Sequence, residues 1–290
     1  MGKLSKAFEK SAQAAAREAP RVKPLSGFCR QAEAGKFGKT AAVTQEPDPG
    51  FSQERWDRRL QKSTDPRSLF FESFRRLRAS ILYPSSGSRP KTLLVTSAVP
   101  HEGKGFVCAN LGVALARGME NHAMMVDCDL RHPSLAQLFG VSGDTGLVDY
   151  LQDNADLSLL IRKTGQPKLS LLPGGQAPAN PAEMLESARM TGLINEMAQR
   201  YPDRIILFDS APGVIASETA TLAKQVDGVI LVVRYGASAK EEVKRFADTL
   251  GQDKILGVVF NAYPENAVEA FLEKRLGYGY GYYNYSARGH

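Results

Sequence analysis

The chain contains the run Leu93-Leu94-Val95-Thr96-Ser97-Ala98-Val99-Pro100-His101-Glu102-Gly103-Lys104-Gly105, in which an apolar segment breaks into a loop that closes with Gly-Lys. A helical pattern resumes directly after this loop. The order is typical of a phosphate-binding loop, whose backbone N–H groups point into a concavity at the N-terminus of the following helix. Lys104 would reach the outer phosphates of a nucleotide. The run therefore predicts nucleotide binding.

Position 105 departs from the usual form of such a loop. The residue after the lysine normally carries a Ser or Thr hydroxyl that ligates Mg²⁺, and here it is Gly105. Water can fill the vacant ligand position, but its orientation is less fixed. We therefore expect nucleotide binding to tolerate this change better than catalysis does.

Apolar runs alternate with helical patterns along the chain. The runs are continuous, as in strands that are covered on both faces. They predict strands over 92–97, 123–126, 169–172, 204–208, 229–233 and 255–260, and helices over 67–82, 107–117, 181–200, 217–224, 239–250 and 265–274. The first helix would have Leu69, Phe70, Phe74, Leu77 and Ile81 on its apolar side. This pattern predicts an α/β fold with a doubly wound, mostly parallel sheet that binds its ligand beyond the carboxyl ends of the strands.

Composition divides the chain into four regions. Residues 1–18 predict a short amphipathic helix, 19–64 a basic linker rich in Pro and Gly, 65–276 the folded domain and 277–290 a Tyr-rich tail, and we expect both ends to be flexible. The first forty residues carry nine Lys or Arg against three Glu, which accounts for the net charge of +6. Such a basic segment can contact anionic lipid or an acidic partner. We expect no nucleic-acid binding from it.

The sequence also excludes several classes of protein. No apolar run approaches the roughly 18–20 residues that a membrane-spanning helix needs, and the N-terminus lacks the apolar core of a signal peptide. We therefore expect a cytoplasmic protein. The three cysteines, Cys29, Cys108 and Cys128, are too few and too scattered for a disulfide framework or a metal cluster.

Aspartates follow two of the predicted strands. Asp127 and Asp129 come after the run at 123–126, and Asp209 comes after the run at 204–208. Buried carboxylates at this edge need a cation, and Mg²⁺ takes one or two carboxylates together with waters and substrate phosphates. The three aspartates therefore predict a magnesium site beside a nucleotide. The alternative is that they only cap turns at the strand ends.

Between the loop and Asp209 lies the element Asp127-x-Asp129-x-Arg131. It resembles the second acidic motif of the bacterial tyrosine autokinases of polysaccharide export, which are relatives of the septum-placing and partition ATPases. Further matches are Leu172-Pro173-Gly174-Gly175 and the runs from Pro178 to Leu185, from Asp227 to Arg234 and from Leu256 to Asn261. The resemblance covers residues 67–261 and extends into the tail. It implies a P-loop NTPase-like domain that uses ATP and Mg²⁺.

The resemblance also implies roles for individual residues. Catalysis would rest on Lys104, Asp127, Asp129 and Asp209, with the metal held by Asp127 and Asp209 and the tyrosine proton accepted by Asp127 or Asp129. The nucleotide would be bound by Pro100, His101, Glu102, Gly103, Lys104, Gly105, Phe106, Arg131 and Asn261. The phosphate acceptors would be Tyr278, Tyr280, Tyr282, Tyr283 and Tyr285. A low-complexity aromatic tail without this role is the alternative.

The motif Glu72-x-x-Arg75-x-x-Arg78 resembles the family's subunit contact, through which one protomer approaches the nucleotide site of its neighbour in a ring. The spacing places the three side chains on one side of a helix, where an ordinary solvated face is the alternative. The partners implied are other copies of the chain, a membrane chain-length or co-polymerase protein and a tyrosine phosphatase. The protein would be recruited to the inner face of the plasma membrane.

Two positions depart from the family pattern. The family usually has Gly where His101 stands, at a turn that favours positive φ, so a side chain there implies strain. The second departure is Gly105. Two functions stay open: an autokinase that regulates the assembly or export of a cell-surface polysaccharide, and a catalytically weak or inactive nucleotide-binding adaptor of the same machinery. A partition-type ATPase is a weaker third alternative, because residues 98–100 supply no additional lysine.

Overall fold

The computed structural model describes residues 52–84, 87–153, 155–201 and 203–262, all of which lie within one compact unit. The helices expected at 1–18 and 265–274 and the tyrosines of the tail lie outside the described residues. Within the described residues, no helix is both long enough and apolar enough to cross a bilayer.

A seven-stranded sheet forms the centre of this unit, in the order β3-β4-β2-β5-β1-β6-β7. The strands are β1 (Thr92–Ser97), β2 (His122–Cys128), β3 (Arg162–Lys163), β4 (Leu169–Leu172), β5 (Arg204–Ser210), β6 (Gly228–Arg234) and β7 (Ile255–Asn261). Every neighbouring pair is parallel except β3 and β4. The mostly parallel sheet and all six predicted strands are confirmed, and the two-residue β3 was not predicted.

Helices connect the strands. They are the 3₁₀ turns η1 (Gln53–Arg55) and η2 (Gln252–Lys254) and the α-helices α2 (Arg58–Ser63), α3 (Leu69–Leu82), α4 (Lys104–Ala116), α5 (Leu135–Phe139), α6 (Leu147–Asp153), α7 (Leu157–Leu160), α8 (Pro181–Leu185), α9 (Ala188–Arg200), α10 (Ser217–Gln225) and α11 (Lys240–Leu250). The single helix expected at 181–200 is wrong. Ser187 breaks it by capping α9, because its side chain accepts a hydrogen bond from the Met190 N–H at 3.1 Å.

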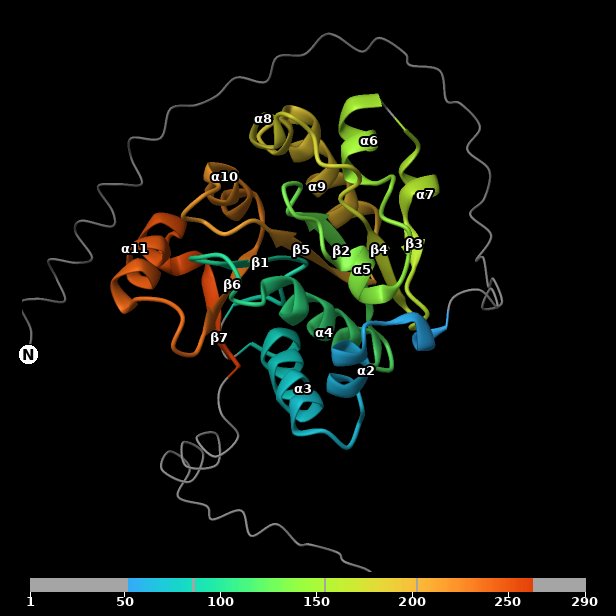
Figure 1. Cartoon of the computed structure of the whole chain (residues 1–290), viewed down its shortest axis with the longest axis vertical. Coiled ribbons are helices and arrows are strands. Elements are labelled where there is room, and N and C mark those ends of the chain that lie inside the picture. Colours follow the sequence, from blue (N-terminus) through green and yellow to red (C-terminus); the bar gives the residue numbers. More distant parts are fainter. Residues whose placement is uncertain (1–51, 85–86, 154, 202, 263–290) are drawn as a thin grey trace, which may run out of the picture. The chain divides into compact units, whose positions relative to one another are not determined.

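The two faces of the sheet carry separate hydrophobic cores. Alternate residues of one strand point to opposite faces, so Leu94 packs in one core while Leu93 and Val95 pack in the other. Helices α2, α3, α4 and α5 cover the face of Leu93, and helices α6 to α11 cover the face of Leu94, as Figure 1 shows. Strands buried on both faces explain why the apolar runs are continuous.

The start of the folded part lies before the predicted boundary at residue 65. Trp56 and Leu60, which we assigned to the linker, are 3% and 0% exposed. The Trp56 indole N–H donates to the Thr164 carbonyl at 2.6 Å, and its ring packs edge-on against Phe139 with centroids 5.2 Å apart. Residues 52–64 are therefore packed against the domain rather than acting as a linker.

Helix α3 buries a partly different face from the one expected. Phe71, Phe74 and Ile81 are buried, whereas Leu69 and Phe70 are about half exposed, at 52% and 49%. The helix is turned so that Phe71 is buried instead of Leu69 and Phe70. Two large apolar side chains are thereby left on the surface near Glu72.

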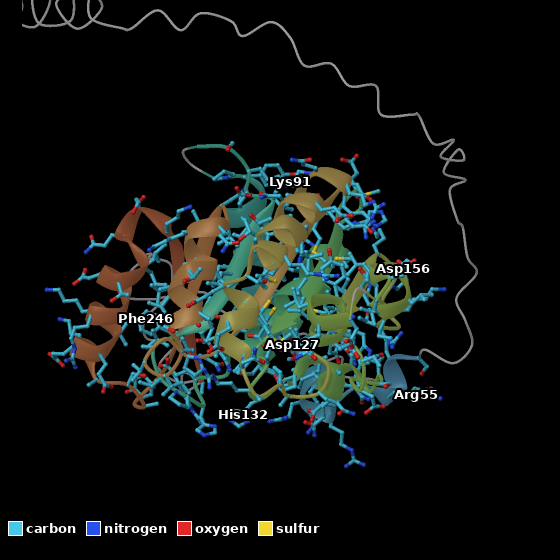
Figure 2. All side chains as sticks on the ribbon, turned by 90° about the horizontal axis from the view of Figure 1, so that it is seen from above. Arg55, Lys91, Asp127, His132, Asp156 and Phe246 are labelled. Atoms are coloured by element: carbon cyan, nitrogen blue, oxygen red, sulfur yellow. The ribbon has the colours of Figure 1, made fainter. Side chains whose placement is uncertain are left out.

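Parallel strands place their carboxyl ends at one edge of the sheet. Figure 2 shows Asp127, near the end of β2, and His132, in the loop that follows, on the side of the sheet away from Lys91, which precedes β1. The loop between β1 and α4 and the end of β5 share that edge. This is the edge where a ligand of such a sheet binds.

Candidate functional site

The loop between β1 and α4 has the backbone of a phosphate-binding loop. Gly103 is in the left-handed region, with φ of 87°, and serves as the N-cap of α4, which begins at Lys104. His101 also has positive φ, at 61°, which confirms the turn expected there and places a side chain where glycine is favoured. The start of α4 is earlier than the predicted residue 107. Because α4 begins at Lys104, the first N–H groups of the helix, which have no partner within it, lie at the end of the phosphate-binding loop.

Buried polar groups hold this loop in shape. Glu102 is 1% exposed, and its carboxylate accepts hydrogen bonds from the Val99 N–H at 3.1 Å, the Arg234 N–H at 3.2 Å and the Ser238 hydroxyl. Asn261, at the end of β7, donates from Nδ2 to the Glu102 carbonyl at 2.8 Å. The Glu102 side chain therefore points into the protein and shapes the loop from within.

Lys104 lies at the N-terminus of α4 and is paired with the acidic motif. Its Nζ is 2.7 Å from Asp129 Oδ2, and both side chains are largely buried. Burial by itself lowers the pKa of Lys104, but the charges of Asp209 and the other two aspartates outweigh it and leave that pKa above its ordinary value. Lys104 is therefore a fixed positive charge among carboxylates.

Asp127 and Asp209 face each other across neighbouring strands, since they are register partners of β2 and β5. Asp127 accepts two backbone N–H groups on Oδ2, from Ser134 and Leu135 at 2.9 Å each. Burial raises the pKa of Asp127 to about 7, although these two hydrogen bonds oppose the shift. Burial, reinforced by the charge of Asp127, raises the pKa of Asp209 well above its usual range.

Asp209 is the unsatisfied member of this group. It is fully buried, and neither carboxylate oxygen has a hydrogen-bond partner among the described residues. A buried carboxylate without a partner is costly, and it needs a cation or a donor. The described residues contain no group of three or more His, Cys, Asp or Glu that could hold a metal by themselves. The unpartnered carboxylate of Asp209, next to Asp127, fits Mg²⁺, which takes one or two carboxylates and completes its shell with waters and phosphates.

Other predicted residues lie around this centre in different ways. Pro100 is exposed, and Phe106 is partly buried against the core. Arg131 donates from Nε to Glu218 Oε1 at 3.2 Å, an acceptor on α10 that sequence reasoning missed. Nothing in the sequence marks Glu218, because its 1% exposure depends on how α10 packs. Arg131 is thereby held between the acidic loop and α10.

Cys108 and Cys128 are buried and form no disulfide. Burial raises the pKa of both thiols well above its usual range, so neither is a reactive thiolate. Their expected ordinary structural role agrees with this burial.

Comparisons with known proteins give the family of this chain. It is 30% identical over 228 residues to the tyrosine-protein kinase YwqD of Bacillus subtilis, an alignment that covers 78% of this chain and 92% of that protein. The chain belongs to the bacterial tyrosine-protein kinase family. It is also 29% identical to the tyrosine-protein kinase wzc of Salmonella typhimurium over 76% of this chain, which spans only 30% of that longer protein.

Solved structures agree with this assignment. The kinase domain of the Escherichia coli tyrosine kinase ETK matches with a TM-score of 0.64 and 27% identity, over 71% of this chain and 82% of that one. The cell division ATPase MinD of Pyrococcus furiosus matches with a TM-score of 0.51 and 24% identity, over 63% and 79%, which shows a shared fold. No protein-family model matches the chain. The two structural matches confirm the P-loop NTPase-like fold.

The motif of α3 that resembles the subunit contact of the kinase family is divided in this structure. Arg75 pairs with Glu72 at 2.9 Å on the exposed face of the helix. Arg78 turns instead toward α4 and donates to the Ala114 carbonyl at 2.9 Å. Arg78 therefore joins two helices of one protomer, whereas Glu72 and Arg75 pair with each other at the surface.

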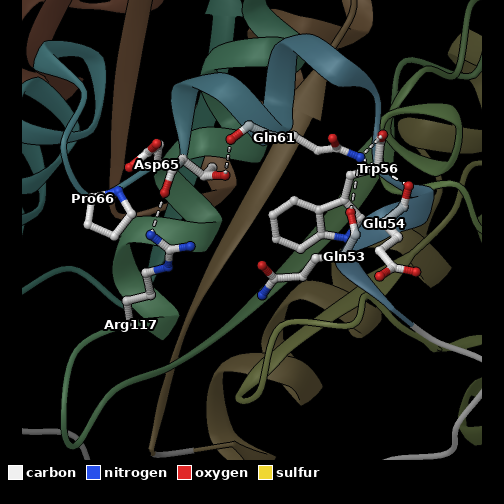
Figure 3. A pocket seen from close by; sticks show the side chains of 8 residues that line it. Gln53, Glu54, Trp56, Gln61, Asp65, Pro66 and Arg117 are labelled. Atoms are coloured by element: carbon white, nitrogen blue, oxygen red, sulfur yellow. Dashed lines mark hydrogen bonds between the residues drawn. The ribbon is translucent and has the colours of Figure 1, made fainter.

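A cavity of about 320 Å³ lies away from the phosphate loop (Figure 3). It is lined by Gln53, Glu54, Trp56, Gln61, Thr64, Asp65, Pro66 and Arg117. Arg117 caps the far end of α4 and donates to the Thr64 carbonyl at 2.5 Å. Since α4 has 13 residues, its length separates this cavity from the loop by about 20 Å. The cavity is therefore not part of the kinase-family site.

Proposed function

We propose that this chain is a protein-tyrosine kinase that uses ATP and Mg²⁺. The observation that supports the proposal best is the meeting of Lys104 with three buried aspartates at the N-terminus of α4, where Lys104 Nζ is 2.7 Å from Asp129. Phosphoryl transfer leaves a protein little covalent chemistry to do, and positioning and charge neutralisation dominate. A lysine and carboxylates fixed at a helix N-terminus supply both.

Each residue then has a defined part. Lys104 exchanges its contact with Asp129 for the β- and γ-phosphates. The backbone of residues 100–106 holds the phosphates, with Arg131 and Asn261 at the border of the nucleotide site. Mg²⁺ would be held by Asp127 and, through water, by Asp209, and the ion would offset the charge of the phosphates. Asp127, or Asp129 once released from Lys104, accepts the proton of the incoming tyrosine.

The substrate of the reaction is the tyrosine cluster at the C-terminus, on the same chain or on a neighbour. Its members are Tyr278, Tyr280, Tyr282, Tyr283 and Tyr285. We propose that copies of the chain meet through α3 in a ring. The exposed pair Glu72–Arg75 and the half-exposed Leu69 and Phe70 beside it favour this surface as the contact. Such a mixed polar and apolar patch is typical of a protein interface.

The cellular role is regulation of the assembly or export of a cell-surface polysaccharide. The proposed partners are a membrane chain-length regulator and a tyrosine phosphatase, and the proposed place is the cytoplasmic face of the plasma membrane. The basic first forty residues are suited to an anionic membrane or an acidic partner. Deletion of residues 1–50 is expected to abolish membrane recruitment, and unchanged recruitment would contradict this part of the proposal.

An adaptor without kinase activity is the second candidate, and Gly105 is the observation that favours it. The usual hydroxyl ligand for Mg²⁺ is missing at that position. In that case the chain would bind nucleotide, serve as a scaffold and be phosphorylated by another kinase.

Phosphate incorporation separates the two candidates. Purified protein is incubated with ATP and Mg²⁺, and phosphotyrosine is mapped in residues 278–285, with Lys104→Met and Gly105→Ser run in parallel. A kinase gives modification that is lost in Lys104→Met. Modification that occurs only in Gly105→Ser would identify an adaptor, and modification that persists in Lys104→Met would refute the assigned role of the lysine.

A further inference from the structure

The space beside Gly105 is bounded by a hydroxyl from another part of the chain. A Cβ at position 105 would lie 2.6 Å from Ser134 Oγ and 3.0 Å from Asp209 Oδ2. Real Cβ atoms do not approach other atoms as closely as the first of these distances, so the Ser134 hydroxyl already occupies the place where a side chain at 105 would begin. Position 105 has no hydroxyl of its own, but the Ser134 hydroxyl lies beside it.

The local structure of α5 leaves this hydroxyl available. Ser134 is the N-cap of α5, yet its side chain makes no capping hydrogen bond. The N-cap serines Ser52, Ser68 and Ser187 all accept such a bond on their side chains. At α5, Asp127 Oδ2 takes over this role by accepting the N–H groups of Ser134 and Leu135. Helix α5 therefore does not need the Ser134 hydroxyl, which lies beside Gly105 instead.

A second observation indicates a ligand at this point. Asp209 is fully buried, both of its oxygens lack hydrogen-bond partners among the described residues, and Oδ2 borders the same space as Ser134 Oγ. Hydroxyl and carboxylate oxygens are the ligand types that Mg²⁺ prefers. Asp127, which holds the N-terminus of α5, is the register partner of Asp209.

We propose that Ser134 supplies the protein hydroxyl for Mg²⁺ that other phosphate-binding loops supply from the residue after the lysine. This inference rests on the proposed binding of nucleotide and Mg²⁺. It assigns the missing function of position 105 to a residue 29 positions later in the chain. A side chain at position 105 would push the Ser134 hydroxyl out of this place.

The test measures the affinity for metal separately from activity. A fluorescent ADP analogue is titrated into the full chain in EDTA and then at increasing Mg²⁺, and the Mg²⁺ concentration that gives half of the strengthening is recorded. Loss of a metal ligand or its support typically weakens metal affinity by about 10–100-fold. We expect Ser134→Ala to raise this Mg²⁺ concentration by at least about tenfold, while binding in EDTA and the urea midpoint stay unchanged.

Three further variants make the test specific. Ser134→Thr keeps a hydroxyl and should behave as the native chain does. Gly105→Ser combined with Ser134→Ala returns the hydroxyl to position 105, removes the collision and should restore the Mg²⁺ dependence. Ser142→Ala removes an exposed serine nearby in sequence and is the matched control.

Each outcome decides between the proposals. A native Mg²⁺ dependence that persists in Ser134→Ala overturns the role of Ser134 while leaving nucleotide binding intact. Nucleotide binding that Mg²⁺ does not strengthen in the native chain also overturns it. A native chain that binds no nucleotide, with or without Mg²⁺, overturns both this inference and the proposed function.

Discussion

Trp56 provides a direct measure of whether residues 52–64 belong to the folded domain. Its side chain is 3% exposed, packs edge-on against Phe139 at 5.2 Å and donates its indole N–H to the Thr164 carbonyl at 2.6 Å. Replacing a buried Trp by Ala costs about 3–5 kcal/mol, since apolar contact is lost and a cavity remains. With a urea slope of about 2 kcal/mol/M, Trp56→Ala should lower the unfolding midpoint by about 2 M.

The smaller change Trp56→Phe separates packing from hydrogen bonding. It keeps most of the ring but removes the donor to the buried Thr164 carbonyl, which costs about 1–3 kcal/mol. The matched control is Met119→Ala, because Met119 is 96% exposed and its loss should change stability by less than about 0.5 kcal/mol. Unfolding is followed by far-UV circular dichroism, since Trp56 is the single tryptophan of the chain.

An unfolding midpoint of Trp56→Ala equal to that of Met119→Ala would refute the packing of residues 52–64 against the domain. That result would mean that residues 52–64 detach from the domain in solution, as the predicted linker would. A large loss in Trp56→Ala with none in Trp56→Phe would keep the packing but refute the hydrogen bond to Thr164.

Two further predictions concern the site. Glu102→Ala should destabilise the protein by about 2–3 kcal/mol and weaken nucleotide binding, because the Val99 and Arg234 N–H groups lose their buried charged acceptor. Glu102→Gln keeps an acceptor and should lose less stability. Equal losses of stability in urea unfolding would contradict this prediction. The second prediction concerns protein free of nucleotide and Mg²⁺. The pKa of Asp127 is about 7 in the folded protein and about 4 in the unfolded chain, so the folded form binds more protons between these two pH values. The free energy of unfolding should therefore fall as pH rises from 4 to 7. Asp127→Asn should flatten that dependence in urea titrations across this range, and an unchanged slope would refute it.

Much of the sheet was predictable because its strands are buried on both faces. A strand in that position shows a continuous apolar run, and the runs at 92–97 and 169–172 match β1 and β4 residue for residue. The short elements were not predictable in this way. Strand β3 has two residues and helix α5 has five, which is too short for any periodicity to emerge.

The candidate site also has a part that the sequence predicts and a part that it does not. The meeting of Asp127 with Asp209 follows from parallel strands whose polar residues stand at the same end, and a sequence reveals that arrangement. Contacts between side chains of distant elements leave no such pattern. The inward turn of Glu102, the partner Glu218 of Arg131 and the approach of Ser134 to Gly105 all depend on how loops pack after the sheet has formed.

The distribution of unsatisfied groups indicates what the carboxyl edge of the sheet requires. Among the described residues, five buried side-chain oxygens lack a hydrogen-bond partner, and three of them belong to Asp209 and Glu218 near this edge. Asp127 meets its need with backbone N–H groups, whereas Asp209 does not, so the unmet demand for positive charge is localised beside Gly105. Such a carboxylate destabilises the metal-free fold. A cation that satisfies it stabilises the folded state by mass action. The same unpaired oxygens therefore lower the stability of the empty site and raise its affinity for a cation, and a substitution that relieves the first effect must weaken the second.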